Sequence, residues 1–395
     1  MFLFSRSKVA ITVEQNNRCH CFNVYLTMAT TTYNIVVFGG DYAGPEVMSE
    51  GLKVLHEVAL RYPLVKFNLT HHPIGGASFD LHGKLIIPEA LQDAKDADAV
   101  LLGAVGGPKW AGQNPSVEAA SLGTLRRELD AFGNLRPINF PAPSLVDTSP
   151  LKSQICSGTD ILIVRELTSG IYFGHRERGE LVAKDTDQYT YEEVARTARL
   201  AGKLAQLSTP PKPIISLDKA NVLAACGSFW RHVVGEVLAK EFPEVPLSHM
   251  LVDSAAMTLA CNPTKLNGIV LASNLFGDII SDEGSAIAGS IGLLPSASLR
   301  GIPPQSGSSK IKGLYEPVHG SAPDIAGKQL VNPVGMILSV AMMFQYSLNM
   351  PEASDLIRKA VSDTIESGIR TADLGGTATT GEFGDAVART LSQLP

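Results

Sequence analysis

The chain has 395 residues, 45% of them hydrophobic and 18% charged, and carries a formal net charge of −6. This length and apolar content indicate a soluble globular protein with a large core, most simply divided into two domains. The negative net charge gives no general attraction to nucleic acid. The longest apolar run, residues 333–343, is shorter than a membrane span of about 20 residues, so it predicts a buried core helix and no membrane segment.

The first 27 residues carry three basic residues and one acidic residue. They lack the apolar core followed by small residues that marks a secretory signal. We expect an extension outside the fold, with Met28 as the working initiator, or else a weak organellar presequence. The five cysteines are odd in number and scattered, which is typical of a reduced intracellular protein. A cytoplasmic location is therefore expected, with mitochondrial import as the alternative.

Short apolar strands alternate with helical patterns along most of the chain. Residues 33–38 predict a buried strand, and Pro45 stands at the start of the helix that follows. A capping box of Thr190 and Glu193 marks the start of a helix over residues 191–207. Such alternation is typical of an α/β fold with a mostly parallel sheet. Further strands are predicted at residues 97–105, 160–165, 213–217 and 268–273.

Two segments interrupt this alternation. Residues 170–190 are polar with scattered aromatic residues, which suits an arm or hairpin projecting from the sheet. Residues 299–313 are rich in serine, glycine and proline and predict a surface loop. No glycine-x-glycine-x-x-glycine pattern follows a strand, so the ordinary dinucleotide fingerprint is absent from the sequence.

The segment NLFGDIISDE places Asp278 and Asp282 four residues apart, on a helix expected to begin near Gly277. Residues at this spacing lie about 5–6 Å apart at Cβ, so the two carboxylates converge and repel each other. A divalent cation between them would remove the repulsion, and Asp253, which follows another short apolar run, offers a third oxygen ligand. Three carboxylates without a thiolate or imidazole favour Mg²⁺ or Mn²⁺. The spacing alone, however, favours an ordinary solvated helix face.

Three arginines, Arg126, Arg136 and Arg165, stand at or near predicted element boundaries. The planar fork of a guanidinium matches a carboxylate. Three such groups around a metal predict a di- or tricarboxylate substrate, although each arginine taken singly is more often a surface residue.

Downstream of Tyr33 the chain contains, in this order, the motifs GNLRP, VRELTSGIYFG, SLDKANVL, LVDSAAM, NLFGDIISDEGSAIAGSIGLLPSAS and YEPVHGSAPDIAGKQLVNP. These motifs resemble those of the 3-isopropylmalate dehydrogenases, β-decarboxylating dehydrogenases related to isocitrate dehydrogenase. The resemblance extends to the C-terminus and implies a two-domain α/β fold. It also implies NAD-dependent, divalent-metal-dependent oxidative decarboxylation of (2R,3S)-3-isopropylmalate to 4-methyl-2-oxopentanoate in leucine biosynthesis.

The resemblance further implies roles for individual residues. Asp253, Asp278 and Asp282 match the metal ligands, with Asp253 supplied by the partner subunit of a homodimer with shared active sites. Lys219, also from across the dimer, matches the lysine tied to removal of the hydroxyl proton, and Tyr172 matches a late proton donor. The implied substrate-binding residues are Leu122, Arg126, Arg136, Arg165, Asn221, Val222 and Asp253.

The implied cofactor is NAD, held by the segment from Glu316 onward. Asp324 is the informative residue here, because a carboxylate accepts hydrogen bonds from both ribose hydroxyls and repels the 2′-phosphate of NADP. The implied cofactor-binding residues are Glu316, His319, Gly320, Ser321, Ala322, Asp324 and Asn332.

The family fold also suggests domain boundaries. Residues 28–131 and 289–395 are expected to form a discontinuous cofactor-binding domain. Residues 132–288 are expected to form the metal, substrate and dimerisation domain, with the arm near residues 170–190. A small dicarboxylate is the expected substrate, and neither nucleic acid nor a membrane is expected as a partner.

The segment EAASLGTLR before the first arginine departs from the family pattern. Leu122 keeps the apolar contact with the substrate branch, but Gly123 replaces a leucine and an extra residue follows Glu118. The lost side chain opens room, so a bulkier 3-alkyl- or 3-benzylmalate of a side pathway is the alternative substrate. The gap also makes Ser121 and Thr124 candidates for the third carboxylate of isocitrate, which we discount because RELTSG lacks the polar run of isocitrate enzymes.

An alternative of another class is a non-catalytic regulatory subunit. Such homologues commonly lose the proton-transfer pair or a metal ligand. This chain keeps Lys219, Tyr172 and all three aspartates, so the enzyme is the favoured interpretation.

Overall fold

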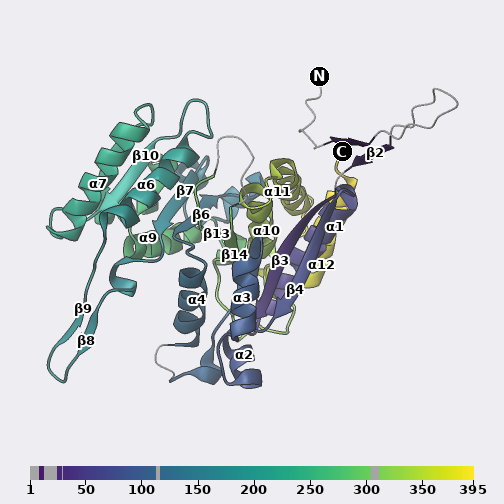
Figure 1. The fold of residues 1–395 in the computed structure, drawn as a ribbon. Helices are drawn as coiled ribbons and strands as arrows, with labels where there is room; N and C mark the ends of the chain where they lie inside the picture. The colour runs from purple at the N-terminus through teal and green to yellow at the C-terminus, as the bar shows by residue number, and fades with distance from the viewer. Residues whose placement is uncertain (1–8, 13–24, 29, 113–115, 304–310) are drawn as a thin grey trace.

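The computed structural model describes residues 9–12, 25–28, 30–112, 116–303 and 311–395. Its centre is a ten-stranded sheet flanked by helices (Figure 1). The predicted α/β fold is confirmed. In sheet order the strands are β11 (Leu247–Leu251), β10 (Ile214–Asp218), β12 (Gly268–Ala272), β7 (Asp160–Glu166), β6 (Gly133–Asn139), β13 (Pro295–Leu299), β14 (Gly313–Pro317), β5 (Ala99–Ala104), β3 (Thr31–Gly40) and β4 (Val65–His72).

Strand direction changes in the middle of this sheet. The outer strands run parallel to their neighbours, as the pairs β3–β5 and β10–β12 show. The central strands β6 and β13 pair antiparallel with each other and with their outer neighbours β7 and β14. In this register Asn134 of β6 stands opposite Arg165 of β7. The motifs GNLRP and VRELTSG are therefore brought side by side at the centre of the molecule.

Eight helices of the described residues pack in two groups around the sheet, and α2 and α3 contact α4 and strand β3. The first group holds α1 against α12 and α10 against α11, and α10 also packs on β13 and β14. The second group holds α6 against α7 and α8 against α9. Their bounds are α1 (Gly44–Arg61), α2 (Gly75–His82), α3 (Pro88–Asp96), α4 (Val117–Glu128), α6 (Tyr191–Ala205), α7 (Cys226–Glu241), α8 (Val252–Cys261), α9 (Asn274–Ile287), α10 (Val334–Tyr346), α11 (Pro351–Glu366) and α12 (Thr380–Gln393).

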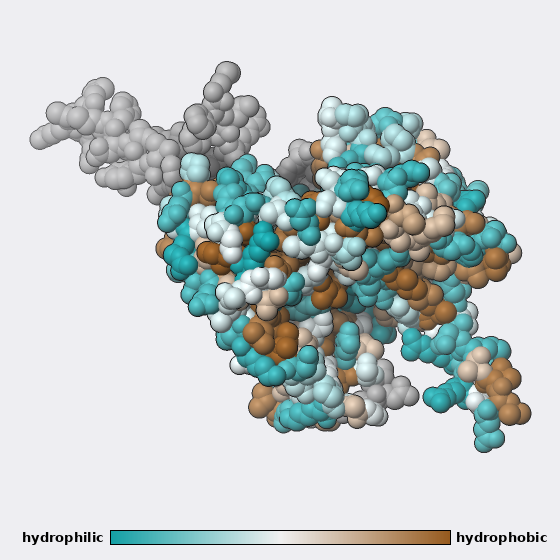
Figure 2. All heavy atoms as spheres, turned by 180° about the vertical axis from the view of Figure 1, so that it is seen from behind, coloured by the Kyte–Doolittle hydropathy of each residue, from teal (hydrophilic) through white to brown (hydrophobic). Residues whose placement is uncertain are grey.

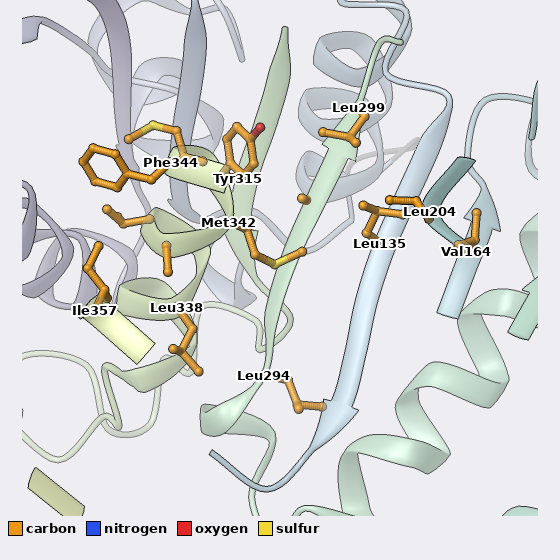
Figure 3. Close-up of a cluster of buried hydrophobic side chains, with 14 of the residues drawn as sticks. Leu135, Val164, Leu204, Leu294, Leu299, Tyr315, Leu338, Met342, Phe344 and Ile357 are labelled. Carbon is orange, nitrogen blue, oxygen red and sulfur yellow. The ribbon is translucent and has the colours of Figure 1, made fainter. Parts of the chain in front are cut away.

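One apolar cluster extends through the molecule from α1 and α10 to α6 and α7. Helix α10 is buried from Val334 to Phe344, as predicted for residues 333–343. Figure 3 shows part of this cluster, from Phe344 and Tyr315 past Met342 to Leu135 on the central strand β6. The continuous packing holds the central strands, and hence the side chains they carry, in a fixed frame.

The structure confirms one predicted helix start and corrects another. Helix α6 begins at Tyr191 with the capping box of Thr190 and Glu193, as expected. Helix α9 begins at Asn274, three residues earlier than predicted, because the Gly277 amide already donates to the Ser273 carbonyl at 2.8 Å. Asp278 and Asp282 therefore lie inside a formed helix rather than at its first turn.

The segment near residues 170–190 forms the predicted arm. Strands β8 (Arg176–Arg178) and β9 (Ala183–Asp185) pair as an antiparallel hairpin that projects away from the sheet (Figure 1). Leu181, between the two strands, is 97% exposed. Figure 2 shows apolar side chains gathered on this arm.

The N-terminal residues are described only in part. Strands β1 (Val9–Thr12) and β2 (Tyr25–Met28) form a two-stranded pair separate from the ten-stranded sheet, whereas residues 1–8 and 13–24 lie outside the described residues. The predicted loop at 299–313 lies between β13 and β14, with residues 304–310 likewise outside. The domain boundaries proposed at 131/132 and 288/289 fall just before β6 and just after α9, and they stay a prediction.

Two expectations drawn from composition can be compared with the described residues. In that part of the chain no helix is long and apolar enough to cross a membrane. Cys156, Cys226 and Cys261 carry free thiols, and Cys19 and Cys21 lie outside it.

Candidate active site

A cavity of about 670 Å³ lies over the centre of the sheet. Its walls come from the end of β5, from α4, from β6 and β7, from the short helix η3 (Gly170–Tyr172), from α9 and from the turn after β14. Among the residues predicted for the site, the cavity is lined by Leu122, Arg126, Arg136, Arg165, Tyr172, Asp278, Glu316, His319 and Gly320.

Two of the predicted arginines are almost fully buried beneath this cavity. Arg136 is 8% exposed and Arg165 is 3% exposed. Loss of water, followed by the nearby charge of Arg136, lowers the pKa of Arg165 to about 10. Arg136 lies in the middle of β6, so the expectation that it stands near an element boundary was wrong. A mid-strand arginine reaches the cavity here because β6 is a central strand whose face forms the cavity floor.

Asp278 and Asp282 lie one turn apart on α9 and face these arginines. Nη1 of Arg165 contacts a carboxylate oxygen of Asp278, and Nη1 of Arg136 lies 3.1 Å from Oδ1 of Asp282 and 3.6 Å from Oδ1 of Asp278. The two like charges thus converge, as predicted from their spacing. Their repulsion is offset by two guanidinium groups.

Tyr172 reaches the same place from η3. Its hydroxyl donates to Oδ2 of Asp278 at 2.9 Å, and the guanidinium of Arg165 lies 5.7 Å from its ring centroid. Loss of water and then the negative charge of Asp278 raise the pKa of Tyr172 above its ordinary value. The hydroxyl is therefore a proton donor throughout the neutral range.

Lys219 and Asp253 do not reach the cavity of their own chain. Instead Nζ of Lys219 lies 2.7 Å from Oδ1 of Asp253, and neither residue is part of the cavity wall. Asn221 and Val222, which follow Lys219, are exposed and also lie away from the wall. Among the described residues, no group of three or more histidine, cysteine, aspartate or glutamate side chains could hold a metal ion. Asp253 thus lies apart from Asp278 and Asp282 within this chain, and the predicted set of three aspartate ligands stays a prediction.

The turn after β14 forms the side of the cavity where the sequence predicts cofactor binding. Nη2 of Arg126 lies 2.8 Å from Oε1 of the buried Glu316. His319 is buried, its Nδ1 lies 2.9 Å from the Gly320 carbonyl, and burial lowers its pKa, so the ring is neutral. Its Nε2 is buried without a hydrogen-bond partner among the described residues, which leaves one polar atom available for a ligand.

Four other residues predicted to bind cofactor lie outside the cavity wall. Ser321 fixes the turn by donating from Oγ to the Gly106 carbonyl at 2.8 Å, and Ala322 takes a positive φ of 41°. Asp324 is exposed. Asn332 bonds to Asp373 and to the Val334 amide, so its side chain supports the start of α10.

The sequence reasoning missed several residues that the structure brings to the site. Asn134 and Asn274 bond directly to the buried arginines, and Phe173 and Arg176 line the cavity from the arm side. Asn134 carried a usable signal, since residues two apart on a strand share a face, here with Arg136. Asn274 precedes Asp278 by four residues, which places both on one face of α9 once the helix is known to begin at Asn274. Phe173 and Arg176 are placed by tertiary contacts that no spacing in the chain reveals.

Residues 34–387 match the family model of isocitrate/isopropylmalate dehydrogenase. The chain belongs to this family. A 3-isopropylmalate dehydrogenase of Alternaria alternata is 63% identical over 368 residues, which cover 92% of this chain and 98% of the relative. The 3-isopropylmalate dehydrogenase of Neurospora crassa is 56% identical over 366 residues, covering 92% and 99% of the two chains.

Solved structures agree with this membership. Isocitrate dehydrogenase from Methylococcus capsulatus superposes with a TM-score of 0.78 at 27% identity, over 91% of this chain and 100% of that one. A β-decarboxylating dehydrogenase from Thermococcus kodakarensis gives a TM-score of 0.73 at 36% identity, over 91% and 96%. The protein is thus an oxidoreductase of the isocitrate/isopropylmalate dehydrogenase family, and the predicted resemblance and enzyme class are confirmed. The named relatives disfavour the alternative of a non-catalytic subunit.

Proposed function

We propose that the protein catalyses NAD-dependent and divalent-metal-dependent oxidative decarboxylation of (2R,3S)-3-isopropylmalate to 4-methyl-2-oxopentanoate, the 2-oxo acid precursor of leucine. The observation that carries the proposal is the convergence of Arg126, Arg136 and Arg165 with Tyr172 and Asp278 on one cavity. Relatives named for the same reaction are 52% to 63% identical to this chain.

The substrate carboxylates are held by the arginines. Arg136 and Arg165 offer guanidinium donors from the cavity floor, and Arg126 offers them from α4. A guanidinium binds a carboxylate through two parallel hydrogen bonds, which fixes the orientation of the acid as well as its position. In the proposed binding mode the arginines hold both malate carboxylates and the C2 hydroxyl faces Asp278.

The donor set near Asp278 fits a hard divalent cation, because Asp278 and Asp282 supply carboxylate oxygens from one helix face. We assign the third ligand to Asp253 of a partner subunit. A bound Mg²⁺ or Mn²⁺ would polarise the substrate hydroxyl and then the ketone oxygen, which favours loss of the proton and of CO₂.

Two side chains would move the protons. Lys219 of the partner subunit would take the proton of the C2 hydroxyl, and NAD, when bound, would supply the hydride acceptor for C2. Tyr172 returns a proton to C3 after CO₂ leaves, which its raised pKa allows because the hydroxyl stays protonated. Each proton thus has a named donor or acceptor.

A homodimer with shared active sites would supply Lys219 and Asp253 of each subunit to the cavity of the other. The support is that Lys219 and Asp253, the two residues assigned to the partner, pair with each other at 2.7 Å away from the cavity of their own chain. Exposed apolar side chains at Val222 and Met257 lie near these residues in sequence, and the arm carries Leu181 at its tip. A second copy would cover such surfaces.

NAD fits the turn after β14. The unpartnered Nε2 of His319 and the cavity-lining Gly320 allow close approach of a cofactor. An added Cβ at Gly320 would meet nothing within 4 Å, so the backbone there faces open space. We assign the preference for NAD over NADP to the carboxylate of Asp324. We also propose a cytoplasmic location for the protein.

One assay tests the proposal directly. Purified protein is incubated with NAD⁺, Mg²⁺ and 3-isopropylmalate, and NADH and CO₂ are measured together. Equal release of the two products is expected, with no turnover after chelation of the metal. NADH formed without CO₂, or no turnover at all, would contradict the proposed reaction.

The wall formed by α4 supports a second candidate substrate, 3-benzylmalate or another malate with a bulky 3-substituent. Gly123 lines the cavity beside Ala119 and Ala120, and a Cβ added at Gly123 would meet no heavy atom within 4 Å. In an unrelated protein, a dry apolar cavity of about 150 Å³ is large enough to bind benzene. The small residues of α4 thus leave room for a substituent larger than isopropyl.

A panel of malates that differ only at C3 separates the two candidates by kcat/KM. If the bulky substituent occupies this space, Gly123→Leu should lower kcat/KM for 3-benzylmalate at least about tenfold, a loss of about 1.4 kcal/mol, while sparing 3-isopropylmalate. Equal effects on both substrates would show that the substituent lies elsewhere.

A further inference from the structure

Two buried asparagines lie behind the two buried arginines. Nε of Arg136 donates to Oδ1 of Asn134 at 3.0 Å. Nε and Nη2 of Arg165 both donate to Oδ1 of Asn274, at 3.0 and 2.7 Å. Both asparagines are fully buried. The same arrangement, an amide oxygen on the Nε side of a guanidinium, thus occurs at each arginine although the asparagines come from different elements, β6 and α9.

Both asparagine side chains are themselves held in place. Nδ2 of Asn134 donates to Oγ of Ser296 at 2.8 Å and of Ser298 at 3.0 Å. Nδ2 of Asn274 donates to the Ser169 carbonyl at 2.9 Å. Because each amide is bonded at both ends, neither can rotate without breaking hydrogen bonds in a buried place. The planes of the two guanidinium groups are fixed accordingly.

The chemistry of the acceptor matters as much as its position. A carboxylate behind the arginine would orient it equally well but would also pair with its charge. An amide oxygen orients the guanidinium through a dipole and adds no negative charge. The carboxylates that do contact these arginines, Asp278 and Asp282, lie on α9 at the side proposed for the metal.

We infer that Asn134 and Asn274 are positioning residues for substrate binding. Each sets the plane of one guanidinium from behind and, being uncharged, leaves the positive charge available to a substrate carboxylate. The inference rests on the proposed function of the cavity as a dicarboxylate site, and it adds two residues that act through Arg136 and Arg165.

The substitution Asn134→Asp tests the inference most cleanly. It keeps the size of the side chain and the acceptor oxygen, and the hydroxyls of Ser296 and Ser298 can turn to donate to the new carboxylate. Apart from the charge, the substitution removes only the long 3.5 Å bond from Nδ2 to the Ala297 carbonyl. We expect the Kd for malate, measured with Mg²⁺ by calorimetry, to rise about 10- to 100-fold, as does KM, at an unchanged melting temperature.

A role in folding alone predicts a different result, because the new pair with Arg136 would then leave binding unchanged or improve it. Wild-type or tighter malate binding by Asn134→Asp would overturn the inference. Asn267→Asp is the matched control. Asn267 accepts from the Asp160 amide and donates to the Gly158 carbonyl, both at 2.8 Å, and lies away from the cavity wall, so its Kd for malate should not change.

Misfolding of Asn134→Asp and failure of the proposed reaction can each be told apart from failure of the inference. If Asn134→Asp does not fold, Asn274→Asp places the same charge behind Arg165, although it also replaces the donor to the Ser169 carbonyl by an oxygen. Unchanged malate binding by Asn274→Asp would overturn the inference. Because malate binding is measured without turnover, failure of the proposed reaction shows separately: the wild type would bind malate yet oxidise none of the 3-substituted malates.

Discussion

The substitution Asp278→Asn removes one charge from the centre of the site while keeping the shape of the side chain. Asp278 contacts Nη1 of Arg165 and accepts from the Tyr172 hydroxyl at 2.9 Å. We expect kcat to fall by about 10³-fold or more, because a cation that stabilises developing charge by several kcal/mol loses a ligand and each 1.36 kcal/mol corresponds to a factor of ten. Tyr172 also loses its charged partner.

The cost to stability should be much smaller. Removing one partner of a fully buried ion pair costs about 3–5 kcal/mol. Here the Asp278 side chain is 30% exposed, and Arg136 keeps its contact with Asp282 at 3.1 Å. The buried Arg165 loses its ion pair with Asp278, but the amide oxygen of the new asparagine can still accept its hydrogen bond and Asn274 still accepts two more. We therefore expect a loss of about 1–3 kcal/mol in the free energy of unfolding, which a domain of this size tolerates.

The assay follows initial rates at increasing Mg²⁺ and the melting temperature in parallel. Asp130→Asn is the matched control, since Asp130 also pairs with an arginine, Arg196 at 3.2 Å, away from the cavity wall. Its kcat should equal that of the wild type. Turnover of Asp278→Asn near the wild-type rate at saturating Mg²⁺ would refute the metal assignment, and loss of the folded state would refute the estimate of its stability.

Three further predictions follow from the site. An equimolar mixture of Lys219→Ala and Asp278→Asn chains, refolded together, should regain about one quarter of wild-type activity, because a shared site across a dimer makes one intact centre in each mixed dimer; no recovery would place each site within one chain. Loss of water and then the charge of Asp278 raise the pKa of Tyr172 above its ordinary value of 10.0. The difference spectrum between the wild type and Tyr172→Phe should therefore show a tyrosinate titration with its midpoint above that value, and Asp278→Asn should lower the midpoint by removing the charge; a wild-type midpoint at or below 10.0 would contradict this. Wild-type kcat/KM should favour NAD⁺ over NADP⁺, and Asp324→Ala should reduce the preference by allowing a 2′-phosphate; equal use of both cofactors by the wild type would remove Asp324 from this role.

The amino-acid sequence by itself determined the parts of this protein that depend on neighbours along the chain. The strands at 31–40, 99–104 and 268–272 and the buried helix α10 follow from short apolar runs. The meeting of Asp278 and Asp282 follows from the pitch of a helix, which brings residues four apart to one face. The start of α9 at Asn274 was not predicted. The first turn is formed by backbone hydrogen bonds such as that from the Gly277 amide to the Ser273 carbonyl, and the side chains of residues 274–276 do not indicate them.

Only the tertiary structure decided which of the predicted site residues share a cavity. Arg126 meets Glu316, 190 positions later in the chain, because α4 and the end of β14 flank the same cavity. Asn134 stands opposite Arg165 because β6 and β7 pair antiparallel in one particular register. Its contact with Arg136, by contrast, follows from their spacing along β6. Lys219 and Asp253 meet each other instead of the cavity. A sequence records periodicity along a strand or helix, but the partner across a sheet depends on register and packing, which the whole folded chain sets together.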